Sequence, residues 1–454
     1  MTSSLANLTR VARTPYGLIA AAYVVLRLNA FAGVKPLIYR DTESYLELSR
    51  QSLLSLDFWA GERSWTVPLL YKLLPDSAGW RTFGQFALSV ACWLALAAVT
   101  AHCLAPGRRR VVAFTVVLLF SAALPLVAWD TVLLTESVSI SLTAAVVAAW
   151  LALARAPGAR TVALVLGATL LWVFARDSNV VLTAGAVVLV AVWAVRAERR
   201  AAPLALMGGL AAICAIALAS TGTDAAQLRR TERPILHVVG FRVLGNADQT
   251  RYFRDHGMPA PTANAQANRR RLAAIGHTVP TDPPTEAFLN WVREHGRGTL
   301  VRYLLTHPYR TVKPVVGQRR RFVNVFEGYR SRETRAVLPA TIGDLLYPAT
   351  YQAVFFWLVV VGLGAAVVAR RHGGRATWLV PLAIVPLQIP HALAVWHGDT
   401  LEISRHGVLV GVLLRLAILL AILLAADALL SRRHAPDSQA PGGREPGLEG
   451  GQPA

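Results

Sequence analysis

Residues 407–430 read GVLVGVLLRLAILLAILLAADALL, and a run this long and this apolar is typical of a helix that crosses a bilayer. A hydrocarbon core of about 30 Å requires about 20 helical residues. Comparable runs recur along the 454-residue chain, in which 54% of residues are hydrophobic, 16% are charged and the mean hydropathy is +0.44. Soluble globular proteins contain a smaller fraction of hydrophobic residues and a larger fraction of charged residues. The sequence therefore predicts an all-α polytopic membrane protein.

The apolar runs predict about ten membrane-spanning helices. Two of them, Thr161–Phe174 and Val180–Val195, are shorter than the usual minimum of about 17 residues. The turn between these two is therefore expected to lie below the membrane surface, in a protein-lined cavity. The predicted spans are Pro15–Val34, Trp80–Leu104, Val111–Ala128, Val132–Ala154, Thr161–Phe174, Val180–Val195, Pro203–Ser220, Pro348–Ala369, Ala376–Trp396 and Gly407–Leu430.

The distribution of arginine supports this topology. If the N-terminus is cytoplasmic, the predicted cytoplasmic segments carry many arginines and a single carboxylate, Glu198. The short outer turns carry Arg176 and Arg405 against a larger number of carboxylates. This asymmetry is the positive-inside pattern. An even number of spans then places both termini in the cytoplasm, and we expect a multi-pass protein of the cell membrane. The cytoplasmic basic residues are Arg10, Arg13, Arg108, Arg109, Arg110, Arg155, Arg160, Arg196, Arg199, Arg200, Arg370, Arg371, Arg375, Arg432 and Arg433.

Two outer segments are too long to be turns, and they define the predicted domains. Residues 1–220 form an N-terminal module of seven spans, with an interfacial loop at residues 35–79 that contains aromatic residues. Residues 221–347 form a basic, mostly helical extracytoplasmic domain. Residues 348–430 form a three-helix module, and residues 431–454 are a disordered cytoplasmic tail rich in Pro and Gly.

The first candidate site follows the first span, in the sequence Tyr-Arg-Asp-Thr-Glu-Ser-Tyr at residues 39–45. Asp41 and Glu43 lie together at the expected outer membrane boundary, beside Tyr45. One interpretation is that Asp41 or Thr42 caps an interfacial helix and that Glu43 lies on its solvated face. The alternative is a catalytic or substrate-binding group.

A second group of polar residues lies at the start of the fourth span. Asp130 precedes this helix and Glu136 lies in its first turn, followed by Ser139 and Thr143 on the same face. A carboxylate at this depth usually faces a cavity or a partner. The positive N-terminus of the helix would also favour Glu136 without any function.

Three arginines lie within or between apolar runs. Arg176 and Asp177 occupy the turn before the sixth span, where they either pair with each other or leave Arg176 to hold a lipid phosphate. Arg27 and Arg415 lie inside the first and last spans, and contact of either with lipid tails costs about 2.5–3.5 kcal/mol on insertion scales. Each should therefore face the interior of the bundle and pair with a carboxylate or a phosphate.

Metal and nucleotide motifs are weak or absent. Residues 397–406, HGDTLEISRH, contain metal-ligand residue types at a spacing that matches no zinc pattern, so no metal-binding residue is predicted. No Walker A sequence occurs, and the lone Gly362-Leu363-Gly364 lies inside a predicted span. The net charge of +20 is compatible with anionic lipids. We expect the membrane, and not nucleic acid, to be the partner.

These features together resemble the GT-C superfamily of membrane glycosyltransferases, which includes the protein mannosyltransferase-like, aminoarabinose transferase-like and RgtA/B/C/D-like groups. The resemblance covers roughly residues 15–195. It is carried by Asp41 after the first span, the Trp/Pro-containing segment at residues 65–70, the sequence Leu-Thr-Glu-Ser at residues 134–137, and the Arg-Asp-Ser-Asn turn at residues 176–179.

The resemblance implies a polyprenyl-phosphate sugar as donor and a hydroxyl of a glycan, lipid or protein as acceptor. Asp41 would act as general base toward the acceptor hydroxyl or would orient it. Glu136 or Asp130 would position the acceptor or help to hold a divalent cation, Mg or Mn; the family is divided on the use of a metal. Arg176 would stabilise the leaving phosphate. The further substrate- or phosphate-binding residues expected are Glu43, Tyr45, Arg27 and Arg415.

Two other classes of function remain open. A transporter or flippase for lipid-linked anions would also use buried arginines, although such proteins often contain internal repeats and none is visible here. A non-catalytic partner in envelope assembly would leave Asp41 and Glu136 pointing apart. The enzymatic hypothesis instead predicts that Asp41, Arg176 and either Asp130 or Glu136 line one outward cavity.

Overall fold

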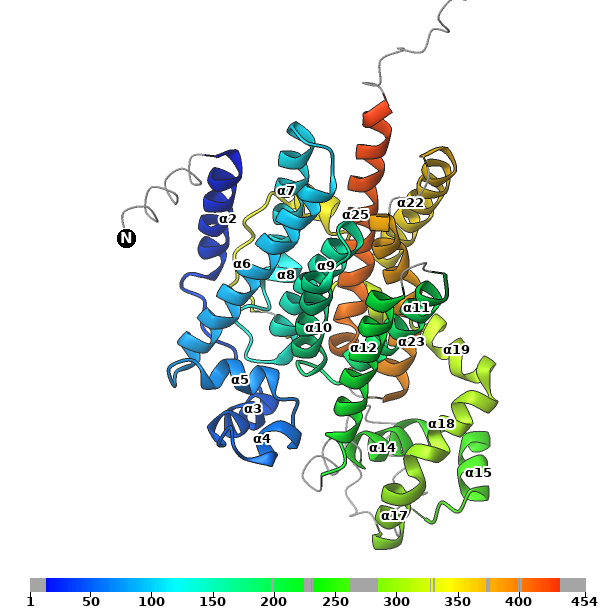
Figure 1. Cartoon of the computed structure of the whole chain (residues 1–454). Coiled ribbons are helices and arrows are strands. Elements are labelled where there is room, and N and C mark those ends of the chain that lie inside the picture. The colour runs from blue at the N-terminus through cyan, green and yellow to red at the C-terminus, as the bar shows by residue number, and fades with distance from the viewer. Residues whose placement is uncertain are drawn as a thin grey trace, which may run out of the picture.

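The computed structural model describes residues 14–196, 200–223, 230, 232–260, 285–326, 328–329, 331–372, 376–398, 400 and 402–432. The regular elements of this part of the chain are all helices, and its only β structure is a single isolated bridge between Leu37 and Val132. Long helices stand side by side as a bundle, and shorter helices gather at one end of it (Figure 1). Most of the predicted cytoplasmic tail, from residue 433 onward, lies outside the described residues.

Six helical segments of the described chain are long and apolar enough to cross a membrane, so the protein has the character of a multi-pass membrane protein. A seventh candidate is a pair of helices bent by 56°, α21 (Ala340–Leu346) and α22 (Tyr351–His372). The six are α6 (Ala78–Cys103), α9 (Thr135–Arg155), α11 (Asn179–Arg196), α12 (Ala201–Ala219), the segment Ala376–Gly398 with η4 (Ala376–Trp378) and α23 (Leu379–Gly398), and the segment Ile403–Ser431 with α24 (Ile403–His406) and most of α25 (Val408–Arg432).

The remaining predicted spans form shorter helices, so the count of ten stays a prediction. α2 (Pro15–Phe31) and α10 (Ala159–Val173) are apolar but have only 17 and 15 residues. The predicted third span is interrupted, since α7 (Arg108–Ser121) ends before α8 (Leu124–Val127) begins. Pro125 lies in the first turn of α8. In a continuous helix its ring would clash with the carbonyl of Ser121 and it has no N–H to donate to that carbonyl, which explains the break.

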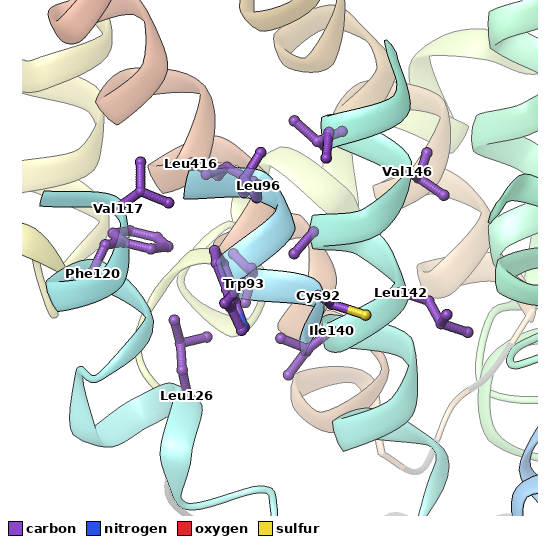
Figure 2. Packing of buried hydrophobic residues seen from close by; sticks show 14 of the residues in the cluster. Cys92, Trp93, Leu96, Val117, Phe120, Leu126, Ile140, Leu142, Val146 and Leu416 are labelled. Atoms are coloured by element: carbon purple, nitrogen blue, oxygen red, sulfur yellow. The ribbon is translucent and has the colours of Figure 1, made fainter. Parts of the chain in front are cut away.

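The core of the bundle is formed by α6, α7, α9 and α25. Trp93 of α6 is almost fully buried and packs against Phe120 of α7, with ring centroids 5.7 Å apart. Figure 2 shows Leu96 and Leu416 beside this pair, with Ile140 on α9 nearby. Dispersion contacts of this kind are the main force between helices in lipid. They hold α25 against α6, α7 and α9.

Two groups of short helices lie at the same end of the bundle (Figure 1). The first comprises α3 (Arg40–Arg50), α4 (Leu56–Ala60) and α5 (Thr66–Lys72). The second has its own apolar core, in which Phe253, Trp291 and Tyr303 are buried. The second group comprises α14 (Arg233–Val238), the π-helical turns η2 (Val239–Val243) and η3 (Val292–Gly296), α15 (Ala247–Asp255), α17 (Glu286–Trp291) and α18 (Arg297–Thr306). α19 (Pro308–Gly317) and α20 (Arg320–Val323) lead from it back to the bundle.

Candidate functional site

A cavity of about 1650 Å³ lies where the two groups of short helices meet the end of the bundle. One part of its lining is polar and includes Asp41, Arg63, Arg176 and Arg405. The other part is apolar and is formed by side chains of α11, α12, α23 and the second group of short helices. The apolar lining includes Val180, Val181, Leu218, Leu393, Val239, Phe241, Leu300 and Leu304. The cavity can therefore accommodate a molecule with one charged end and one apolar end.

Thr42 fixes the position of α3 and with it the position of Asp41. The fully buried Thr42 hydroxyl accepts a hydrogen bond from Tyr39 N at 3.0 Å and donates to Leu133 O at 2.8 Å. Leu37 N donates to Thr131 O at 2.9 Å, and Leu133 N donates to Leu37 O at 3.0 Å. These bonds tie the segment after α2 to the segment that leads into α9. Asp41 is thereby held close to the start of α9.

Asp41 contacts two guanidinium groups. Its Oδ1 lies 2.9 Å from Arg63 Nη2, and its Oδ2 lies 3.1 Å from Arg405 Nη2. The Asp41 side chain keeps 34% of its surface exposed. Partial burial acts to raise the pKa of Asp41, but Arg63 and Arg405 outweigh this effect and hold the pKa below its usual value. Asp41 is therefore ionised and accessible from the cavity.

Glu136 lies beneath this layer, in the first turn of α9, and is 1% exposed. Its Oε1 lies 3.1 Å from Arg405 Nε and 3.4 Å from Arg176 Nη1. Arg176 comes from the turn between α10 and α11 and donates to His406 Nδ1 at 2.8 Å. A buried carboxylate requires this compensation, since an isolated charge is strongly disfavoured in an apolar interior. The structure thus brings Asp41, Glu136 and Arg176 into one cluster, in which Asp41 and Arg176 line the cavity and Glu136, contrary to the expectation that it would line the cavity too, does not.

Arg405 is the centre of the cluster, and we did not single it out from the sequence. Besides Asp41 and Glu136, it contacts Glu402 Oε2 at 2.7 Å, and its guanidinium lies 5.3 Å from the centre of the Tyr329 ring. Its position one turn before an apolar run, three residues after Glu402, was the available signal. Arg63 was also missed, because it lies in a loop with no distinguishing pattern.

Two further predicted residues lie at the cavity. Glu43 and Tyr45 both line it, from the same helix as Asp41. The Glu43 side chain is exposed. Tyr45 is 5% exposed, with the Arg63 guanidinium 4.9 Å from its ring centre. Burial raises the pKa of the Tyr45 hydroxyl, so this group stays protonated at neutral pH.

Asp130 and Arg27 do not line the cavity. They form a buried ion pair with each other inside the bundle. Arg27 also donates to Tyr23 Oη at 2.8 Å, and Ser137 donates to Asp130 Oδ1 at 3.2 Å. Arg27 therefore has the carboxylate partner expected for an arginine within a span. The geometry favours Glu136 over Asp130 at the site, because Asp130 neutralises Arg27.

Arg415 also lies apart from the cavity. Its guanidinium donates to Pro348 O at 2.8 Å and to Val323 O at 2.7 Å, and it lies 4.4 Å from the centre of the Tyr347 ring. These carbonyls belong to the irregular chain around α20, α21 and α22, where regular helical hydrogen bonds are interrupted. Arg415 thus satisfies backbone acceptors, and this placement differs from the predicted contact with a carboxylate or phosphate.

The residues at the site do not fit a divalent cation. In the described ranges, no group of three or more His, Cys, Asp or Glu side chains has an arrangement that could hold a metal ion. Asp41, Glu136 and Glu402 converge on Arg405. A guanidinium at the centre of three carboxylates repels a second cation and occupies the oxygens that Mg or Mn would need. The carboxylates of the cluster are therefore already paired with arginine.

Comparison with known proteins leaves the chain without a match: no protein-family model matches the sequence, and a search of curated proteins finds no match.

Proposed function

We propose that this chain is a GT-C-like membrane glycosyltransferase, which moves a sugar from a polyprenyl-phosphate donor to an acceptor hydroxyl at the outer face of the membrane. The observation that carries the proposal is the meeting of Asp41, Glu136 and Arg176 around Arg405 beside a large cavity. These residues come from four separate segments of the chain. Such a convergence of charges is characteristic of functional sites.

The polar part of the cavity suits the two chemical tasks of sugar transfer. Asp41 is exposed enough to accept the proton of an acceptor hydroxyl as the hydroxyl attacks the anomeric carbon. Arg63, Arg176 and Arg405 can donate to the phosphate that leaves. In the free protein, Arg63 and Arg405 make Asp41 a weak base. A phosphate that draws Arg405 away from Asp41 would make Asp41 a stronger base at the moment when the donor is bound.

The apolar part of the cavity suits the lipid portion of the donor. Val180 and Val181 of α11 and Leu218 of α12 line it, and both helices belong to the candidate spans. A chain of isoprene units can pass from the bilayer along these side chains while its phosphate remains at the arginines. The apolar lining supports a lipid-linked donor over a soluble sugar nucleotide, because a sugar nucleotide would need a nucleotide-binding site.

The proposed topology has ten spans, both termini in the cytoplasm and the cavity on the outer side of the cell membrane. The positive-inside distribution of arginine supports this orientation. The bent pair of α21 and α22, together with the helices α2, α7 and α10, would then complete the count as short or bent spans.

The decisive experiment measures sugar transfer from synthetic polyprenyl-phosphate sugars by the full-length protein in proteoliposomes. We expect Asp41→Asn to lower the transfer rate at least about 100-fold, the usual contribution of a general base. Asp57→Asn is the matched control, because Asp57 is an exposed carboxylate of the same outer segment that does not line the cavity. Normal transfer by folded Asp41→Asn would refute the assignment, and donor movement across the bilayer without transfer would favour a flippase.

A further inference from the structure

A second basic cluster lies away from the cavity, at the junction of α19 and α20. It consists of Lys313, Arg319, Arg320 and Arg321, all of them exposed. Among the residues that the structure describes, none of the four has an ion pair with a carboxylate, and none of them lines the cavity. This cluster therefore carries positive charge that the described part of the protein does not neutralise.

The cluster lies where three long helices reach the same end of the bundle. The Arg319 and Arg320 guanidiniums lie 4.8 Å and 5.4 Å from the centre of the ring of Tyr351, the first residue of α22. The next residues pack against the other two helices, since the Phe322 ring lies 6.3 Å from Trp396 near the end of α23 and also contacts Gly407, just before α25. The cluster therefore lies where these apolar helices end and polar segments of the chain begin.

Apolar side chains next to the cluster are exposed. On α19, Thr311 and Val315 face inward, and Thr311 O accepts a hydrogen bond from His397 Nε2 at the end of α23. The opposite face of α19 exposes Val312 and Val316. The first turns of α22 expose further apolar side chains, Phe355, Phe356 and Val359. A solvated surface would not combine uncompensated cations with so many exposed apolar groups at the end of a membrane bundle.

We infer that Arg319 and Arg320, with Lys313 and Arg321 around them, bind the headgroup of an anionic phospholipid whose acyl chains lie along Phe355, Phe356 and the outer face of α19. Arginine donates to a phosphate in a bidentate manner, and the Tyr351 ring holds both guanidiniums at the start of α22. Basic clusters beside a membrane span are suited to anionic lipids. The site is separate from the cavity and does not depend on the proposed transferase activity.

The test measures the thermal unfolding midpoint of the full-length protein in a neutral detergent, with added phosphatidylglycerol, phosphatidylcholine or inorganic phosphate. Phosphatidylglycerol should raise the midpoint, because a ligand that binds the folded state stabilises it. Phosphatidylcholine and inorganic phosphate should leave the midpoint unchanged. In the variant R319Q/R320Q the phosphatidylglycerol shift should fall by about half or more. An equal response to phosphatidylcholine or to inorganic phosphate would overturn the inference.

Two further variants make the result specific. R251Q/R254Q removes two exposed arginines of α15, so it has the same change of charge, and it should keep the full phosphatidylglycerol shift. R319K/R320K keeps the charge and removes the bidentate guanidiniums, so it should retain only part of the phosphatidylglycerol shift, and it tests the site even if R319Q/R320Q fails to fold. A full shift in R319K/R320K would contradict the role given to the two guanidiniums. If R251Q/R254Q loses as much of the phosphatidylglycerol shift as R319Q/R320Q does, the shift reflects a general effect of charge, and the proposed lipid site is refuted.

Discussion

Arg405 Nε lies 3.1 Å from Glu136 Oε1, and this contact joins the turn before the last long helix to the first turn of α9. Glu136 is 1% exposed and Arg405 is 6% exposed, so both charges are withdrawn from water. The free energy of such a pair depends on the presence of both partners. Arg405 also reaches Asp41, so the contact couples the stability of the bundle to the organisation of the cavity.

Arg405→Gln should destabilise the folded protein by about 3–5 kcal/mol, because Glu136 is left buried with less compensation. The double variant Arg405→Gln/Glu136→Gln should recover part of this loss, since it removes both charges. Thermal unfolding of the wild type, both single variants and the double variant gives the coupling. If the effects of the two substitutions are simply additive, the pair is not coupled.

Acid should weaken the contribution of Asp41 to stability. The pKa of Asp41 in the folded protein lies below its usual value of about 3.9. Its contribution is therefore complete above that usual value and is lost as the pH falls through the lower folded pKa. We expect the difference in unfolding midpoint between wild type and Asp41→Asn to be largest near neutral pH and to shrink below about pH 4. A constant difference from pH 6 to pH 3 would contradict the ion pairs of Asp41.

The pair formed by Arg27 and Asp130 should prove structural. Asp130→Asn should lower the stability by about 3–5 kcal/mol, because Arg27 loses its buried counterion. The variant that has Arg27→Met and Asp130→Leu together should be much closer to wild type. Neither change should affect the dependence of transfer on donor concentration once folded protein is isolated. A large rise in the KM for the donor would instead indicate that Asp130 takes part in donor binding.

Thr42→Val should cost about 1–3 kcal/mol, because Tyr39 N and Leu133 O both lose their hydroxyl partner in a buried position. The transfer rate should also fall, since α3 would no longer be held against the start of α9. Thr42→Ser keeps the hydroxyl and serves as the control for both measurements. Equal activities of the two variants would show that Asp41 is positioned by other contacts.

The helices of the bundle were predictable because apolar runs of this length have no other stable arrangement in a membrane. The break between α7 and α8 was not predicted, although Pro125 was the visible signal. The grouping of Asp41, Glu136 and Arg176 was also predicted, because each follows or precedes a span on the same expected side. Their distances depend on contacts between distant segments, such as the hydrogen bond from Thr42 to Leu133 O, and could not be read from the sequence.

The choice between Asp130 and Glu136 required the three-dimensional structure. The two carboxylates lie close in sequence beside the same span, and their partners distinguish them. Arg27 from α2 pairs with Asp130, whereas Arg176 and Arg405 pair with Glu136. The roles of Arg63 and Arg405 likewise depend on contacts between segments far apart in the chain. Sequence patterns describe local periodicity, and they do not indicate which residues pair between segments far apart in the chain.

The dependence of the cluster on Arg405 has a consequence for biosynthesis. The ribosome completes α3 and α9 long before it reaches α24, so a nascent chain contains Asp41 and Glu136 without the cation that joins them. If the chain is the proposed transferase, its cluster would then be complete only after synthesis of α24. A chain that stops before α24 would leave Glu136 without one of the two arginines that compensate its burial, so the folding of the N-terminal helices would stay incomplete until the C-terminal helices arrive.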